Sequence, residues 1–300
     1  MDVRQTTLEV GADRPFRALH LSDSHVCLAD ERENARKLAL AKRRSAGFDA
    51  GVPGRAAAYL QEQLAYADTH GLPILHTGDF CDFVSDANLE AMGKLLFSRD
   101  CFMAAGNHEY SQYVGEASED EAYKLQSYDR VQACCKNDLR FASRERNGVN
   151  FVAVDNVYYN FTARQLALLE QEIAKGKPIV LLMHTPIYTP KLHDYMIHTL
   201  GESCGYLVGT PEEALAAYSP ERRIQQTADG PTRAFVDYVQ HQPLIRAVLA
   251  GHVYHDFETR LPGGAMQLIT GGGSKEGGRK DDVYRDGRAV CAGVSCLRIG

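Results

Sequence analysis

The sequence predicts an α/β fold, because of how its apolar residues are distributed along the chain. Short apolar runs of strand length alternate with longer segments in which apolar residues recur at helical spacing. With 44% hydrophobic and 24% charged residues, the 300-residue chain has the composition of a globular protein that buries a substantial core. It contains neither an internal repeat nor a low-complexity linker. We therefore expect a single domain over residues 1–300.

Three strands are expected in the first half of the chain, each ending at a cluster of polar residues. They are expected at residues 16–21, 73–76 and 101–105. Helices are expected over residues 55–70, with Gly71 as the stop signal, and over residues 86–97. The polar, basic stretch 30–45 is consistent with either an irregular insertion or a surface helix. Its Lys42-Arg43-Arg44 run is expected to be solvated.

The second half alternates in the same way. Asn147-Gly148 predicts a tight turn between strands at 141–143 and 149–154. Thr162 and Gln165 form a capping box that opens a helix ending near Gly176. Further elements are expected as a strand at 178–183, a helix starting at Thr210-Pro211, and strands at 245–249, 266–270 and 289–297.

Two long segments between these elements have possible roles near a site. The excursion at about residues 191–230 is the best candidate for an insertion over the active site. The glycine-rich loop at residues 271–280 is either a strand connection or a loop that closes over a phosphate.

Charge and cysteine usage argue against several classes of protein. The formal net charge of −6 disfavours broad electrostatic capture of nucleic acid or of a membrane surface. The N-terminus has no signal-peptide pattern, and no apolar run is long enough to span a bilayer. The eight cysteines include no Cys-x-x-Cys, so we expect unpaired thiols and a cytoplasmic location, with a Cys134–Cys135 pair as the minor alternative.

Five polar clusters each follow an apolar strand. They are Asp23-x-His25, Gly78-Asp79-x-x-Asp82, Gly106-Asn107-His108-Glu109, His184 and Gly251-His252. Strand ends at one edge of an α/β sheet converge, so these side chains are expected to meet. A mixed set of imidazole, carboxylate and amide ligands suits Mn, Fe, Zn, Co or Ni. A carboxylate such as Asp79 can bridge two cations about 3.5–4 Å apart, the spacing of centres that activate water on phosphate esters.

This ordered set of motifs resembles the signature of the calcineurin-like metallophosphoesterase superfamily. The matches run from residue 23 to residue 252, and the expected closing strands extend the resemblance over most of the chain. The resemblance implies a four-layer αββα sandwich of the α/β (α+β) class, with two mixed β-sheets flanked by helices.

The resemblance also implies roles for individual residues. The first metal site would consist of Asp23, His25 and the bridging Asp79, and the second of Asp79, Asn107, His184 and His252. The catalytic residues would be His108, as general acid or cationic stabiliser of the leaving oxygen, and Asp82, which orients it. For Glu109 a structural role is expected.

The chain departs from the family pattern at the last ligand of the first site. The expected Gly-His-x-His reads Gly251-His252-Val253-Tyr254-His255, so a tyrosine stands in the slot of that ligand. His255 would reach the metal if a β-bulge absorbs the extra residue. The alternatives are Tyr254 as a phenolate ligand, or a weakened first site.

The resemblance implies a hydrolase acting on phosphate ester bonds, a phosphatase or a phosphodiesterase. It would hydrolyse a small-molecule phosphomonoester or phosphodiester through a hydroxide activated by two divalent metal ions. The alternative is a catalytically impaired metal-binding module that recognises a ligand or partner. A nuclease is disfavoured by the acidic charge. The sequence leaves the substrate and the oligomeric state open.

Overall fold

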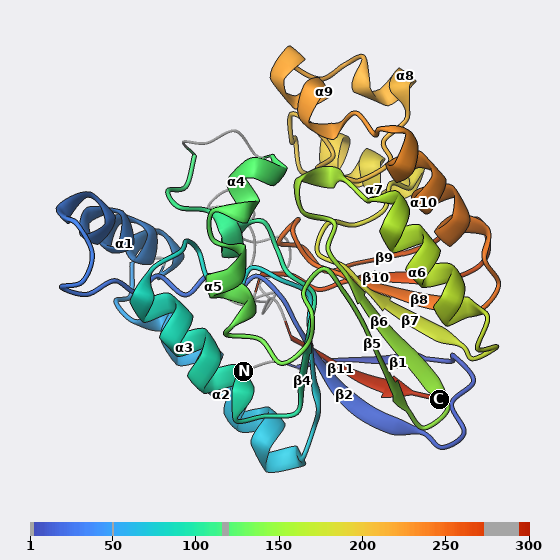
Figure 1. Ribbon diagram of the computed structural model, residues 1–300, viewed down its shortest axis with the longest axis horizontal. Coiled ribbons are helices and arrows are strands. Elements are labelled where there is room, and N and C mark those ends of the chain that lie inside the picture. The colour runs from blue at the N-terminus through green and yellow to red at the C-terminus, as the bar shows by residue number, and fades with distance from the viewer. Residues whose placement is uncertain (1–2, 50, 116–119, 273–293) are drawn as a thin grey trace.

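The computed structural model describes residues 3–49, 51–115, 120–272 and 294–300. In this part of the chain, two mixed β-sheets pack face to face, and helices cover the outer face of each (Figure 1). The layers therefore follow the order helix, sheet, sheet, helix. The expected αββα sandwich is confirmed.

The first sheet has five strands in the order β1-β11-β2-β3-β4. Pairing is parallel between β1 and β11 and along β2, β3 and β4, whereas β11 runs antiparallel to β2. The strands are β1 (Arg4–Leu8), β2 (Phe16–Leu21), β3 (Ile74–His76), β4 (Cys101–Met103) and β11 (Val294–Ile299).

The second sheet has six strands in the order β5-β6-β7-β8-β10-β9. The four central strands are parallel, and the two edge strands β5 and β9 run antiparallel to their neighbours. The strands are β5 (Phe141–Arg146), β6 (Val149–Val154), β7 (Ile179–Leu182), β8 (Ile245–Ala250), β9 (Phe257–Arg260) and β10 (Met266–Ile269).

Three apolar cores hold the layers together. Between the sheets, Leu75 and Phe102 of the first sheet pack in one cluster with Phe151 of the second. On the outer face of the first sheet lie α2 (Arg55–His70) and α3 (Asp86–Phe97), and on that of the second lie α6 (Ala163–Ile173) and α10 (Gly230–His241). Each fully buried Leu or Phe contributes about 1.5–3 kcal/mol, so the sandwich is a stable frame for the loops at its edge.

The remaining helices are short, except for the first. They are α1 (Ala35–Phe48), α4 (Glu121–Leu125), α5 (Tyr128–Gln132), α7 (Pro190–Asp194), α8 (Glu212–Leu215) and α9 (Pro220–Gln226), with 3-10 turns η1 (His108–Tyr110) and η2 (Val157–Tyr159) and a π-helical turn η3 (Tyr195–Thr199).

Most expected elements are present at or near their expected bounds. Residues 16–21 and 86–97 form the predicted strand and helix, and Thr162 and Gln165 make both bonds of the capping box. The ambiguous stretch 30–45 is resolved as helix α1, which Asn34 caps by accepting a hydrogen bond from the Lys37 backbone N–H.

Other expectations need correction. Thr210 does not cap the following helix, because its hydroxyl donates to the Leu207 carbonyl and Pro211 takes the cap position instead. Strands β1 and β9 were not expected. The last strand begins at Val294, and residues 273–280 of the glycine-rich loop and residues 289–293 of the expected strand lie outside the described residues.

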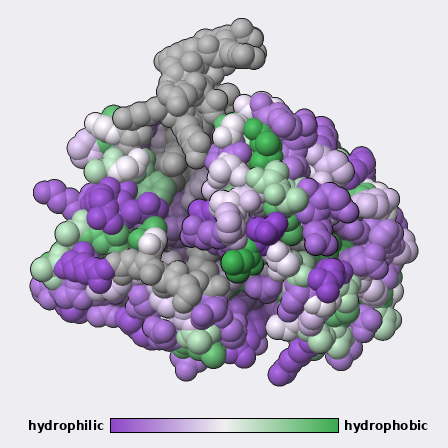
Figure 2. Space-filling model, turned by 90° about the horizontal axis from the view of Figure 1, so that it is seen from above, coloured by the Kyte–Doolittle hydropathy of each residue, from purple (hydrophilic) through white to green (hydrophobic). Residues whose placement is uncertain are grey.

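The surface and the cysteines are as the sequence predicts for a globular protein with unpaired thiols. In the face drawn in Figure 2, hydrophobic residues form small groups among hydrophilic ones. Among the described residues, no helix is both long and apolar enough to cross a bilayer. The seven cysteines in this part of the chain are free thiols, Cys134 and Cys135 included.

Candidate metal centre

Loops at the carboxyl ends of five strands bring the candidate ligands together. Asp23 and His25 follow β2, Asp79 follows β3, Asn107 follows β4, His184 follows β7 and His252 follows β8. Both sheets therefore contribute side chains at one edge of the sandwich. Ligand atoms of Asp23, His25 and Asp79 lie within 4.8 Å of one another, and so do those of Asp79, His184 and His252.

The backbone at these positions is strained. Asp23, His25, Asp79 and His252 have positive φ angles of 53°, 44°, 56° and 72°. For a residue with a Cβ atom this conformation costs on the order of 1–3 kcal/mol. It persists only where the surrounding structure holds it, and such strain is typical of functional sites.

Two glycines of the motifs are required by close packing at the ligands. A Cβ atom at Gly106 would overlap Oδ1 of Asp79, and one at Gly251 would overlap the hydroxyl of Ser22. At these two positions the need for glycine is steric, because neither has a positive φ.

Three buried oxygen atoms of the candidate ligands lack hydrogen bonds. Within the described residues, Oδ1 of Asp23, Oδ2 of Asp79 and Oδ1 of Asn107 have no hydrogen-bond partner. The other carboxylate oxygens are occupied, since Asp23 Oδ2 accepts from the His252 N–H and Asp79 Oδ1 from the His108 N–H. A buried oxygen without a partner costs about 1–3 kcal/mol, and more if it is charged. A cation between Asp23 and Asp79 would satisfy both carboxylate oxygens, and Asn107 lines the cavity beside them.

Each imidazole among the candidate ligands has one ring nitrogen in a hydrogen bond to a group outside the set of candidate ligands. His25 Nδ1 donates to Asp82 Oδ1 at 2.9 Å, and His184 Nδ1 donates to the Thr77 carbonyl at 2.7 Å. His252 Nε2 forms a 2.9 Å hydrogen bond with the Tyr159 hydroxyl. Each ring thus has one nitrogen held by an outer partner, which is the usual arrangement of metal-binding histidines.

The other ring nitrogens face the unpartnered oxygens. His184 Nε2 lies 3.1 Å from Asp79 Oδ2 and 3.1 Å from His252 Nδ1. His25 Nε2 lies 3.8 Å from both Asp23 Oδ1 and Asp79 Oδ2. The donor atoms of this mixed nitrogen and oxygen set therefore fit divalent transition metals.

The carboxylates and imidazoles of the centre shift one another's pKa values. Burial opposes ionisation of Asp79, but the imidazoles of His184, His108 and His25 hold its pKa well below the ordinary value. Burial likewise opposes the protonation of His184, but the carboxylates of Asp79 and Asp23 raise its pKa to about 9. Dications would replace the protons that these imidazoles hold in the metal-free chain.

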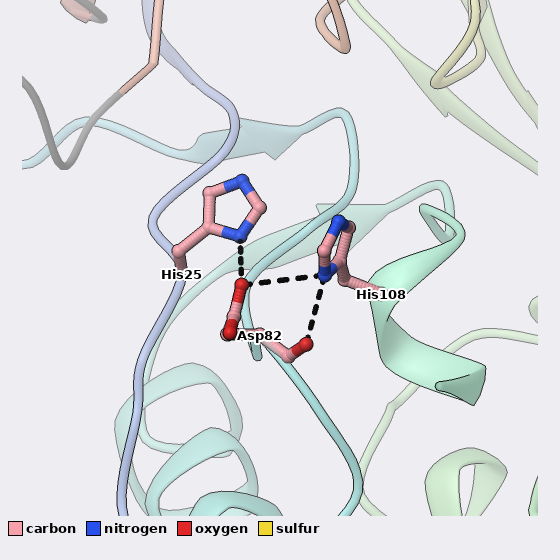
Figure 3. Close-up of side chains that lie close together, drawn as sticks. All are labelled: His25, Asp82 and His108. Atoms are coloured by element: carbon pink, nitrogen blue, oxygen red, sulfur yellow. Dashed lines mark hydrogen bonds and ion pairs between the residues drawn. The ribbon is translucent and has the colours of Figure 1, made fainter. Parts of the chain in front are cut away.

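Asp82 connects three side chains behind the centre (Figure 3). Both the His25 and His108 rings point toward it, and His108 Nδ1 lies 3.3 Å from Asp82 Oδ1 and 2.8 Å from the Asp82 carbonyl. Arg44 donates to both carboxylate oxygens, at 2.6 and 2.7 Å. Although burial opposes it, the charges of Asp79 and Asp82 raise the pKa of His108 to about 10.

Arg44 corrects the expectation that the whole basic run of residues 42–44 is solvated. Lys42 and Arg43 are exposed, but the Arg44 side chain is only 28% exposed and pairs with the fully buried Asp82. The sequence contained a signal for this, because Arg44 is four residues from both Leu40 and Phe48, which lie on the buried face of α1. Sequence reasoning also missed Tyr159, for which no motif exists.

Tyr254 and His255 line the same cavity but make different contacts. The Tyr254 hydroxyl forms a 2.9 Å hydrogen bond with His25 Nε2. The His255 ring lies edge-on to Tyr195, with the centroids 6.2 Å apart, and His255 belongs to none of the three clusters of potential metal ligands among the described residues. Burial, and then the charges of Asp23 and Asp79, raise the pKa of Tyr254 well above the ordinary value.

Glu109 lies beneath the centre and binds backbone. Its carboxylate accepts from the N–H groups of Asp79, Cys81 and Gly106. Burial, and then the charge of Asp79, raise its pKa to about 7. These bonds tie the loops after β3 and β4 together, as the expected structural role requires.

A cavity of about 340 Å³ opens at the centre. Asn107, His108, His252 and Tyr254 line one part of it, and Met196, Glu202, Tyr206, Arg222 and Gln225 from the 191–230 segment line another. A larger hollow between α8, α9 and α10 contains no candidate ligand. The 340 Å³ cavity has the size of a small-molecule site.

The two-sheet sandwich has a cluster of carboxylates and imidazoles at one edge, and its sequence matches a known family. Residues 16–255 match the calcineurin-like phosphoesterase family. The chain belongs to this family.

Comparison with individual proteins adds information on the fold. No curated protein matches the chain. A dimetal phosphatase from Danio rerio superposes with a TM-score of 0.51 at 13% identity, covering 87% of this chain and 89% of that one. A phosphopantetheinyl hydrolase from Mycobacterium tuberculosis gives a TM-score of 0.40 at 13% identity over 90% of both chains. A putative 5′-nucleotidase from Staphylococcus aureus gives 0.44 at 12% identity, over 95% of this chain and 54% of that one.

Proposed function

We propose that this protein hydrolyses a small phosphomonoester or phosphodiester at a centre of two divalent metal ions. The observation that carries the proposal is the convergence of two groups of buried ligand atoms that share Asp79, one with Asp23 and His25 and one with His184 and His252. An outer partner holds the other nitrogen of each imidazole. The first site is formed by Asp23, His25 and Asp79, and the second by Asp79, Asn107, His184 and His252. Bound dications would activate water and neutralise charge on the phosphoryl oxygens.

The chain itself supplies the group that assists the leaving oxygen. His108 lines the cavity, and its Nδ1 is held by the Asp82 carbonyl, which leaves Nε2 to act on the substrate. Although burial opposes protonation, the charge of Asp82, which is not a proposed metal ligand, raises the pKa of this imidazole and favours its protonated form. His108 therefore stabilises or protonates the departing alkoxide.

The test is turnover of p-nitrophenyl phosphate and bis(p-nitrophenyl) phosphate by metal-stripped protein, with and without added Mn²⁺ or Ni²⁺. We expect metal-dependent hydrolysis of at least one ester, and a loss of about 100-fold or more in Asp79→Asn, since bound metal contributes several kcal/mol to such reactions. Asp237→Asn, at an exposed carboxylate on α10, is the matched control. Equal activity in Asp79→Asn and the control would refute the proposal.

The position of Tyr254 keeps the metal-binding module as the second candidate. A hydroxyl that already occupies His25 Nε2 is consistent with a centre that holds one cation and does not turn over substrate. Elemental analysis separates the candidates. Two tightly held metals support the enzyme, whereas one metal without hydrolysis supports the module.

A further inference from the structure

Tyr254 presents its hydroxyl to the metal-facing nitrogen of the first site. His25 Nδ1 is used by Asp82, so Nε2 is the nitrogen available to a cation, and the Tyr254 hydroxyl lies 2.9 Å from it. The carboxylate oxygens of Asp23 and Asp79 lie 3.8 Å from the same nitrogen. Four donor atoms of the chain are thus gathered at this point.

The structure holds the tyrosine in this place. Tyr254 has a φ of 60°, a left-handed conformation that is costly for an aromatic residue. The ring packs closely against Gly272, where a Cβ atom would lie only 2.8 Å from the Tyr254 ring. His252, two residues earlier, has a φ of 72°. The turn after β8 therefore directs both side chains into the centre.

The shortest distances between donor atoms, which are hydrogen bonds or ion pairs in the metal-free chain, suit ligands that share a metal. With bonds of about 2.1 Å, neighbouring ligands at right angles are about 3 Å apart. The pairs of the second site, His184 Nε2 with Asp79 Oδ2 and with His252 Nδ1, are both 3.1 Å apart. The 2.9 Å between Tyr254 and His25 matches them. His255 instead lies against Tyr195.

We propose that the Tyr254 hydroxyl oxygen is the fourth protein ligand of the first metal site. This inference rests on the proposed two-metal function. The first site then offers three oxygens and one nitrogen, whereas the second offers two oxygens and two nitrogens. Oxygen ligands suit Mn²⁺, and imidazole suits Zn²⁺. Most mixed nitrogen and oxygen sites bind Zn²⁺ more tightly than Mn²⁺, so the sites differ in degree. The first site favours Zn²⁺ over Mn²⁺ less than the second does, and Mn²⁺ in excess occupies the first site while Zn²⁺ occupies the second.

The test is metal content after equilibrating the metal-stripped full chain with Zn²⁺ and a large excess of Mn²⁺, read by elemental analysis and Mn²⁺ electron paramagnetic resonance. We expect one of each metal in the unaltered chain. Tyr254→Phe keeps the ring and removes the oxygen, so Mn²⁺ affinity falls about tenfold or more while Zn²⁺ remains. Tyr254→His supplies an imidazole and shifts the content toward two Zn²⁺.

Two control variants distinguish loss of the Tyr254 oxygen from a general effect of substitution and from binding by His255. Tyr238→Phe makes the same change on α10, away from the centre, and His255→Ala removes the competing ligand. The inference is overturned if Tyr254→Phe binds Mn²⁺ like Tyr238→Phe, or if His255→Ala is the variant that loses it. It is also overturned if the unaltered chain holds only one cation. Metal-dependent hydrolysis with either of the first two results would leave the proposed function standing. A single cation in the unaltered chain, or the absence of hydrolysis in all chains, would count against the function itself.

Discussion

At the scale of single residues, the site is defined by how each polar atom is used. Asp23 and Asp79 each use one oxygen to bind a backbone N–H and leave the other without a partner, so the loops are fixed by the same carboxylates that would hold cations. Preorganisation of this kind lowers the cost of assembling the site when metal binds.

The glycines beside the ligands provide a first prediction. Gly106→Ala should destabilise the protein by about 1–3 kcal/mol or more, because its Cβ would overlap Asp79 Oδ1 and force the loops apart. Gly47→Ala is the matched control, since Gly47 lies inside α1 with open space around it and alanine favours helix. Urea unfolding should give opposite signs for the two variants. A Gly106→Ala chain as stable as the control would contradict the packing described here.

Asp82 provides a second prediction. Asp82→Asn keeps the shape but removes the charge that His25 and His108 share, so kcat should fall about 100-fold with a smaller change in KM. Asp86→Asn, at a partly exposed carboxylate in the first turn of α3, is the control. Steady-state kinetics on an aryl phosphate measure kcat and KM for both variants. If the two variants have equal kcat, Asp82 does not position the catalytic imidazole.

The positions of the candidate ligands at one edge of the sandwich could be predicted from sequence, because each follows an apolar strand and strand ends converge. Tyr159 could not be assigned, because its partner His252 is distant in sequence and no motif marks it. For Arg44, helical spacing indicates burial but does not identify its partner Asp82. The sequence shows that Tyr254 departs from the family pattern. It does not specify the direction of the side chain, because that direction depends on the conformation of the turn after β8.

At the scale of secondary-structure elements, helix α1 is attached to the site by one ion pair. Arg44 reaches from α1 to Asp82, while Leu40 and Phe48 bury the same face of the helix. The Phe48 ring also stacks on His25, with centroids 4.5 Å apart. The helix therefore supports the first metal site from behind.

This contact yields a third prediction. Arg44→Gln should destabilise the protein by about 1–3 kcal/mol, less than for a fully buried pair because Arg44 is partly exposed. Arg43→Gln, at the exposed neighbour, should stay within about 0.5 kcal/mol of the unaltered protein. Chemical denaturation of both variants tests it. Similar midpoints would mean that the ion pair does not anchor α1.

Central strands and capped helices could be predicted well, and edge strands could not. Phe16–Leu21 is a mostly apolar strand that is buried from Ala18 onward, whereas Arg4–Leu8 is a mostly polar edge strand. It pairs with Val294–Ile299, almost the full chain length away, so its existence depends on a tertiary contact that local pattern does not encode.

At the scale of the whole molecule, two buried histidines under the site make stability depend on pH. Burial lowers the pKa of His20 to about 3 and that of His76 to about 4. In the unfolded chain a histidine titrates near pH 6.5. Below that pH the unfolded chain binds protons that the folded chain does not, so the free energy of unfolding falls with falling pH until about pH 4.

A fourth prediction follows. Between pH 6 and 4 each of the two histidines should contribute about 1.4 kcal/mol per pH unit to this slope. His20→Asn should reduce the slope by that amount, measured by urea unfolding in the presence of EDTA so that metal release does not contribute. An unchanged slope would show that His20 takes up its proton in the folded state.

The two sheets together form the site, because β2, β3 and β4 supply ligands from one sheet and β7 and β8 from the other. The central claim is therefore that two cations lie where the two sheets meet. The most direct measurement is anomalous diffraction from crystals of the protein grown with Mn²⁺. We predict two peaks, one at the first site and one at the second, with Asp79 in contact with both. No peak at these residues, or metal bound only elsewhere, would contradict the account.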